Sequence, residues 1–212
     1  MRVIVTRPEG QAGELTDRLR ALGHEVVLCP LLRIEPLGGG QIDVAGYDWV
    51  VVTSANGARE LARRLHDRPR RLAAIGPATA AALAEHGLET DLVSSVSTQE
   101  GLLAELPRPA GRVLVAAAES ARRLLVDELR ADFVPLYRTV ELEPVELPEG
   151  DLVVLASASA ARAFAALGLD IPAVSIGPRT TAAANEAGVR VVGEAATHDV
   201  GGILNAIARL GS

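Results

Sequence analysis

Short runs of apolar residues alternate with amphipathic stretches along most of this chain. Val3–Val5 is one such run, and Leu15, Leu19 and Leu22 follow it at helical spacing, just before Gly23. The spacing i, i+4, i+7 predicts a helix over 12–22, and glycine is the usual residue after a helix end. Short continuous apolar strands that alternate with helices are typical of a parallel sheet covered on both faces. The pattern therefore predicts an α/β fold.

The alternation continues to the end of the chain. Further strands are predicted at 26–28, 49–52, 72–75, 92–93, 112–115, 152–155, 174–176 and 189–192. Further helices are predicted at 58–65, 79–85, 98–106, 120–129 and 201–210, and a helix is also predicted after each of the strands at 152–155 and 174–176. Each helix follows a strand, as parallel strands require.

The second half of the chain resembles the first. Ile75–Ala81 (IGPATAA) matches Ile176–Ala182 (IGPRTTA) at an offset of 101 residues. Asp48–Ser54 matches Asp151–Ser157 at an offset of 103. Arg2–Val5 likewise matches Arg112–Val115 at 110, so the matches are collinear. They indicate an internal duplication.

Two proline-bearing segments interrupt the alternation. Pro30–Pro36 precedes three glycines, and Pro135–Glu141 leads to Pro144 and Pro148. Proline favours extended backbone in the residue before it, so both segments are predicted to be extended linkers. We expect the chain to cross from one domain to the other at each linker. The predicted division is a discontinuous domain at 1–35 and 144–212, an inserted domain at 42–134, and linker strands at 36–41 and 135–143.

The composition narrows the classes of function. Among the 212 residues, 21 are basic and 27 acidic, so the formal net charge is −6. All the basic residues are arginines, which excludes a lysine Schiff base. A net acidic chain with few aromatic residues is also a poor nucleic-acid binder. We therefore expect no nucleic-acid partner.

Metal, redox and membrane functions are also disfavoured. Cys29 is the only cysteine and the four histidines are scattered, so no metal-binding spacing and no disulfide framework is present. No apolar stretch approaches the ~20 residues of a membrane-spanning helix. The N-terminal residues also lack the pattern of a signal peptide. We expect a cytoplasmic protein with no membrane partner.

Polar residues follow the predicted strands, where ligands of open parallel sheets bind. These candidates are Arg7, Thr53, Ser54, Asn56, Thr79, Ser157, Ser159 and Thr180. The hydroxyls have two interpretations: they cap the following helices, or they join helix N–H groups in binding carboxylates or phosphates. Neither glycine turn has the GxGxxG or GxxxxGK[ST] pattern of a nucleotide site, and no GxSxG motif indicates a hydrolase.

Tyr137 and Arg138 lie in the second linker. The tyrosine either packs at the domain junction or supplies a phenol that donates a hydrogen bond or a proton to a ligand. From the residues alone, the chain is an enzyme acting on an anionic substrate, a hinged two-domain protein that binds a small anion without catalysis, or a flavin-binding redox protein. The few aromatic residues count against the flavin.

At these residues the chain resembles the uroporphyrinogen-III synthase family. The motifs that carry the resemblance are VTRP-x-x-Q-A from Val5, VTSANG from Val52, the two IGPxT turns, LYRTV from Leu136, and THDVGGIL from Thr197. The resemblance implies two flavodoxin-like α/β domains joined by a two-stranded antiparallel linker, one domain being discontinuous. It also implies closure of the linear tetrapyrrole hydroxymethylbilane to uroporphyrinogen III, with inversion of ring D, loss of water, and no metal or organic cofactor.

The resemblance also assigns roles to residues. The tyrosine of the family falls on Tyr137, the expected proton donor to the leaving hydroxyl. The substrate carries eight carboxylates, and its expected binding residues are Arg7, Thr53, Ser54, Asn56, Thr79, Arg138, Ser157, Ser159 and Thr180. We expect a monomer, with transient hand-over of substrate from the preceding enzyme of the pathway. A hinged anion-binding protein without catalysis remains the alternative.

Overall fold

The computed structural model describes residues 1–211. They form two compact units. Unit 1 consists of Met1–Arg33 together with the chain from Val140 onward, and unit 2 is Ile34–Thr139. The chain therefore begins in unit 1, passes through unit 2 and returns to unit 1.

Within the described residues, unit 1 holds a five-stranded sheet in the order β11-β10-β9-β1-β2, and all its strand pairs are parallel. Its strands are β1 (Arg2–Val5), β2 (Glu25–Leu28), β9 (Leu152–Leu155), β10 (Ala173–Ser175) and β11 (Val191–Glu194). Its helices are α1 (Gly13–Ala21), α6 (Ala158–Ala165), α7 (Pro178–Glu186) and α8 (Val200–Ala208), with a 3-10 turn at Arg209–Gly211.

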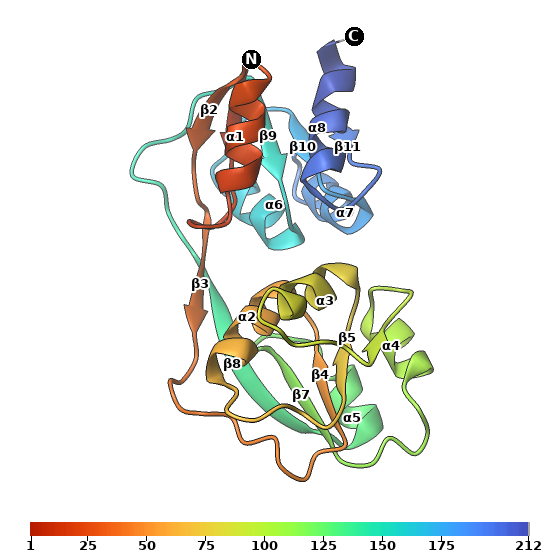
Figure 1. Ribbon diagram of the computed structural model, residues 1–212. Coiled ribbons are helices and arrows are strands. Elements are labelled where there is room, and N and C mark those ends of the chain that lie inside the picture. The colour runs from red at the N-terminus through yellow and green to blue at the C-terminus, as the bar shows by residue number, and fades with distance from the viewer. Residues whose placement is uncertain (212) are drawn as a thin grey trace. The chain divides into compact units, whose positions relative to one another are not determined.

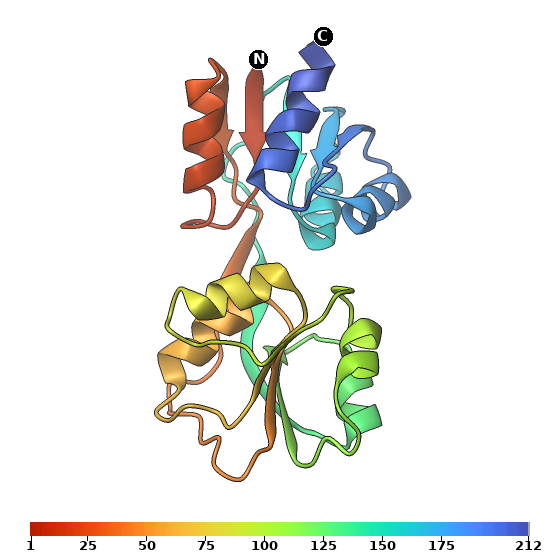
Figure 2. The same ribbon diagram turned by 45° about the vertical axis from the view of Figure 1, so that its right-hand side comes forward.

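Helices cover both faces of the unit 1 sheet. Val3 and Val5 belong to the core beneath α1 and α8, whereas Ile4 belongs to the core beneath α6 and α7. Successive residues of a strand point to opposite faces, so a strand buried on both faces is continuously apolar. Figures 1 and 2 show the two helix layers on either side of the sheet. The predicted α/β architecture with parallel sheets is confirmed.

Unit 2 repeats this arrangement. The sheet built on it has the order β3-β8-β7-β4-β5-β6 within residues 1–211. Its strands are β3 (Leu32–Pro36), β4 (Trp49–Val52), β5 (Leu72–Ala74), β6 (Leu92–Val93), β7 (Val113–Ala118) and β8 (Asp132–Glu141). Its helices are α2 (Ala55–Arg64), α3 (Pro77–Ala84), α4 (Gln99–Glu105) and α5 (Leu124–Leu129). One core lies beneath α2 and α3, and the other beneath α4 and α5.

The topology confirms the internal duplication. The sequence offsets make β5, β4 and β7 the counterparts of β10, β9 and β1. These strands are neighbours in the same order, β5-β4-β7 in unit 2 and β10-β9-β1 in unit 1. Corresponding glycines also meet the same obstacle: a Cβ atom on Gly101 would overlap the carbonyl oxygen of Val96, and one on Gly202 would overlap that of Thr197.

The strands that join the units begin and end at other residues than the sequence predicts. A linker strand is predicted at 36–41, but β3 ends at Pro36 and 37–41 forms no strand. Arg64 holds this loop, because its guanidinium donates to the carbonyl oxygens of Leu37 and Gly40 at 2.8 and 2.9 Å. Gly38 adopts a positive φ of +75°, which turns the chain and so keeps these residues from continuing as an extended strand.

The second linker also differs from the prediction of a strand at 135–143. β8 starts three residues earlier, at Asp132, and its first half pairs with β7 in parallel. Its second half pairs with β3. The Leu37 N–H donates to the Leu136 carbonyl and the Leu142 N–H to the Leu31 carbonyl, so this pairing is antiparallel.

In the described part of the chain, no helix combines the length and the apolar character that crossing a membrane requires.

Candidate functional site

Polar side chains gather where the parallel strands of unit 2 end. Thr53 and Ser54 follow β4, and Thr79 follows β5 through the turn at Gly76. Ser54 is the N-cap of α2, with extended backbone, and its Oγ accepts the N–H of Gly57 at 3.0 Å. This edge is where ligands bind in open parallel sheets.

Tyr137 reaches the same edge from β8. Its side chain is only 7% exposed, and its Oη lies 3.0 Å from Ser54 Oγ. Its carbonyl oxygen accepts the N–H of Glu119 at 2.9 Å, which holds the backbone beside the end of β7. Burial raises the pKa of Tyr137, and the hydrogen bond with Ser54 offsets part of that rise. The phenol is therefore protonated at neutral pH and able to donate.

Thr79 and its counterpart Thr180 occupy matching positions, each the third residue of a helix that starts with proline. The N-caps are Gly76 and Gly177, which offer no side-chain acceptor to the first N–H groups. The threonines are 3% and 4% exposed. At each start the proline has no N–H, and the N–H groups of the threonine and of the residue after it donate to the carbonyl oxygen of the N-cap glycine. The threonine hydroxyl and the partial positive charge of the helix start are the features that suit a carboxylate.

In unit 1, Ser157 is the N-cap of α6 and follows β9, as Ser54 follows β4. Its Oγ accepts the N–H of Ala160 at 3.1 Å and lies 3.1 Å from Ser159 Oγ. Both predicted serines are thus brought together at the carboxyl edge of this sheet. Capping and ligand binding do not exclude each other, because a hydroxyl has one donor and two acceptor sites.

Arg7 follows β1 at the same edge of unit 1. Its Nη1 lies 3.5 Å from the carbonyl oxygen of Gln11, and its Nε is buried without a partner among the described residues. Burial lowers the pKa of Arg7 from its usual value, which the nearby carboxylate of Glu14 partly offsets. A guanidinium in such surroundings favours an anionic partner.

The other two predicted residues have different environments. Arg138 donates to the Glu35 carboxylate from Nε and Nη2, at 2.9 and 2.8 Å. Arg138 therefore ties β8 to β3 and is not joined to Tyr137. Asn56 is the second residue of α2 and half-buried.

Sequence reasoning missed a hydrogen-bonded chain at this edge of unit 1. Ser175 Oγ lies 2.6 Å from Thr181 Oγ1, which in turn contacts the Glu194 carboxylate. At the offset of 101 residues, unit 2 has Ala74, Ala80 and Val93 instead. Comparison of the two copies for polar residues present in only one would have found this chain.

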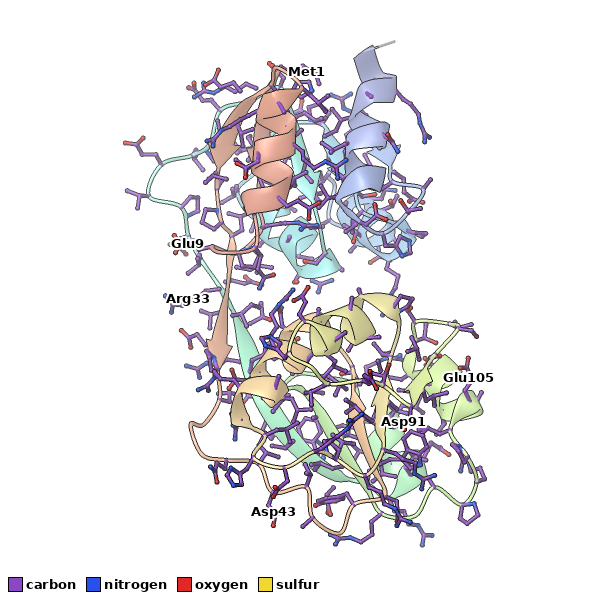
Figure 3. All side chains as sticks on the ribbon, viewed as in Figure 1. Met1, Glu9, Arg33, Asp43, Asp91 and Glu105 are labelled. Carbon is purple, nitrogen blue, oxygen red and sulfur yellow. The ribbon has the colours of Figure 1, made fainter. Side chains whose placement is uncertain are left out.

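Three further ionisable residues of unit 1 are Glu9, Arg33 and Cys29. Glu9 lies in the exposed loop between β1 and α1, and Arg33 lies on β3 (Figure 3). Cys29 is buried, and burial raises the pKa of its thiol. No group of three or more His, Cys, Asp or Glu residues in residues 1–211 is arranged to hold a metal ion.

Comparisons with known proteins agree on one family. Residues 13–205 match the family model described as "Uroporphyrinogen-III synthase HemD". The uroporphyrinogen-III synthase of Synechococcus elongatus is 27% identical over 246 residues, covering 97% of this chain and 93% of that protein. The "Porphyrin biosynthesis protein HemD" of Ruminiclostridium josui is 29% identical over 234 residues. The match covers 93% of this chain but 46% of that protein, so the chain spans about half of its length.

A solved structure has the same fold. It is a mutant uroporphyrinogen III synthase from the extremely thermophilic bacterium Thermus thermophilus, with a TM-score of 0.63 and 19% identity. The superposition covers 99% of this chain and 98% of the other.

Proposed function

Because this chain belongs to the uroporphyrinogen-III synthase family, we propose that it catalyses closure of hydroxymethylbilane to uroporphyrinogen III. The observation that carries the mechanism is the nearly buried, protonated phenol of Tyr137 at an edge lined by hydroxyls and helix N-termini. These groups suit a substrate that carries eight carboxylates and a leaving hydroxyl. The chemistry needs donors in fixed places more than a strong nucleophile.

Each unit offers groups that bind carboxylates. In unit 2 these are the hydroxyl of Thr53, Asn56, and the start of α3 with Thr79. In unit 1 they are Arg7, the Ser157–Ser159 pair, and the start of α7 with Thr180. Helix N–H groups carry partial positive charge, so they meet anions without any excess of basic residues. Arg138 contributes through the β3–β8 ladder or by exchanging Glu35 for a substrate carboxylate.

Tyr137 acts as the general acid. Electrons from the pyrrole nitrogen of ring A, which carries the hydroxymethyl group, expel the hydroxyl as its C–O bond breaks, and the phenol proton converts the leaving group to water. The product is an azafulvene cation. The reaction then joins ring A to the substituted carbon of ring D, and the spiro intermediate fragments and recombines to invert that ring. The carbon that forms the last bond loses a proton, which restores the phenol, so the net change is loss of one water.

Further features follow from the same assignment. Unit 1 and unit 2 correspond to a discontinuous and an inserted domain of the flavodoxin-like kind. In support, the strands of unit 1 follow the order 2-1-3-4-5 when numbered within the unit. We place the enzyme in the cytoplasm as a monomer that receives its unstable substrate from the preceding enzyme.

The isomer of the product tests this function. Purified protein is incubated with freshly made hydroxymethylbilane, and the products are separated after oxidation. An excess of the type III isomer over the spontaneous type I isomer is expected. Production of type I alone, with tight binding of the bilane, would instead establish a binding protein without catalysis.

A further inference from the structure

The hydroxyl of Ser54 has two partners of different kinds. It accepts the Gly57 N–H at 3.0 Å and lies 3.0 Å from Tyr137 Oη. A hydroxyl has one hydrogen, and either oxygen of the Ser54–Tyr137 pair is able to donate. The direction of this bond decides whether the phenol hydrogen points at Ser54 or is free for a ligand.

The N-cap position favours donation by Ser54. Its oxygen already accepts a hydrogen bond from the first turn of α2, where the helix carries partial positive charge. Accepting a hydrogen bond polarises the hydroxyl and strengthens it as a donor. Besides the Gly57 N–H, the hydrogen-bond partner of Ser54 Oγ is Tyr137 Oη, 3.0 Å away.

Gly57 lies close to the Ser54 hydroxyl. A Cβ atom on Gly57 would lie 3.0 Å from Ser54 Oγ and 3.7 Å from Leu136 Cδ1. Any side chain at position 57 would therefore crowd the Ser54 hydroxyl.

The other unit lacks this pair. The linkers PLLR and PLYR align at an offset of 105 residues, which places Leu32 where unit 2 has Tyr137. Ser157, the counterpart of Ser54, pairs with Ser159 Oγ at 3.1 Å instead. Both units therefore have a serine that caps a helix. Only in unit 2 does the capping serine also lie beside a tyrosine hydroxyl.

We propose that Ser54 is a positioning residue that donates its hydrogen to Tyr137 Oη and so leaves the phenol hydrogen free for the leaving group of the substrate. The proposal rests on the acid role of Tyr137 and deepens it. After proton transfer, the same bond stabilises the phenolate, and Ser54 itself gains and loses no proton. The sequence predicts Ser54 only as a substrate-binding residue, whereas this role acts through Tyr137.

The sign of a pKa change tests the direction of the bond. A donor hydrogen bond to the phenol oxygen stabilises the phenolate, so its loss in Ser54→Ala raises the pKa of Tyr137. If the phenol donates instead, its loss lowers that pKa. The chain has two tyrosines, so Tyr137 is titrated alone by tyrosinate absorbance in a Tyr47→Phe background.

Kinetics supply the second readout. Ser54→Ala is expected to lower kcat about tenfold with KM within about twofold, because the bond strengthens only as charge develops on the phenol. Ser54→Thr keeps the cap and the donor, and is expected to restore most of kcat. Thr98→Ala is the matched control, since Thr98 caps α4 through the Gly101 N–H at 3.0 Å and touches no tyrosine.

The outcomes separate this role from the proposed function. An unchanged or lowered pKa of Tyr137 in Ser54→Ala overturns the proposal, even if type III product is formed at the normal rate. A raised pKa in a protein that makes no type III product supports the hydrogen-bond direction and rejects the enzymatic role. Equal losses of kcat in Ser54→Ala and Thr98→Ala would show that Ser54 acts only as a helix cap.

Discussion

Tyr137 is the residue on which the proposed chemistry depends. Tyr137→Phe keeps the buried ring but removes the proton, so we expect kcat to fall about 100-fold, the lower end for general acid catalysis. KM is expected to change little, because the carboxylates are bound elsewhere. Single-turnover measurement of type III product checks this expectation. Tyr47→Phe is the control, since the Tyr47 hydroxyl donates to Asp132 at 2.8 Å and has no part in the site. Full turnover by Tyr137→Phe would contradict the acid role of Tyr137.

The duplicated threonines are expected to affect binding instead. Thr79→Val and Thr180→Val keep the shape of a buried side chain but remove its hydroxyl, so each should raise KM about fivefold and leave kcat nearly unchanged. Thr16→Val is a control for the substitution itself. The Thr16 hydroxyl is also buried, it has no partner in the described chain, and it lies within α1. A KM that rises only as much as in Thr16→Val would exclude the threonines from binding.

At the scale of elements, the cap of α8 links stability to pH. Asp199 accepts the Gly202 N–H at 2.7 Å, and this bond, followed by that from Thr197, lowers the pKa of Asp199. A lowered folded-state pKa gives stability that is present above the unfolded pKa, about 4, and is lost as pH falls through the folded value. Asp199→Asn keeps a cap without charge, so its deficit in urea midpoint at pH 7 should shrink below about pH 4. A deficit that is constant from pH 7 to pH 3 would show that charge is not involved.

The elements also show where prediction from sequence succeeds. Trp49–Val52 and Leu152–Leu155 are strands at the predicted residues, because burial on both faces makes them continuously apolar. The first half of β8 escapes prediction because Pro135 interrupts its pattern, although the strand continues through the proline with a shifted register. The helix predicted at 120–129 begins only at Leu124. Residues 119–123 form no helix, and the guanidinium of Arg123 stacks on the ring of Phe133.

Side-chain pairing is the part that sequence does not predict. The hydroxyl loop and the tyrosine are both identifiable, but Ser54 and Tyr137 are 83 residues apart in the chain. Their contact depends on β8 lying beside β7 and β7 beside β4. Likewise, sequence alone predicts that Arg138 binds a ligand. It does not reveal the ion pair with Glu35, because that pair depends on the antiparallel pairing of β8 with β3.

For the whole molecule, the question is whether the two units unfold together. Each has its own pair of cores, and the chain has one tryptophan, Trp49, buried in unit 2 at 4% exposure. Fluorescence of Trp49 therefore reports unfolding of unit 2, whereas far-UV circular dichroism reports both units. If the units unfold independently, a substitution that destabilises only unit 1 shifts part of the circular dichroism transition and leaves the Trp49 fluorescence transition unchanged.

Gly202→Ala provides that change. Its Cβ would overlap the Thr197 carbonyl oxygen, a backbone atom that cannot move aside, and such overpacking costs about 1–3 kcal/mol. We expect the circular dichroism transition of this variant to split, with one step at a lower urea concentration while the Trp49 midpoint stays unchanged. Gly101→Ala makes the same overlap with Val96 in unit 2 and should move the Trp49 midpoint. Gly13→Ala, with open space around the new methyl, should move neither. A Trp49 midpoint that shifts equally in Gly202→Ala and Gly101→Ala would instead show that the two units unfold as one cooperative body.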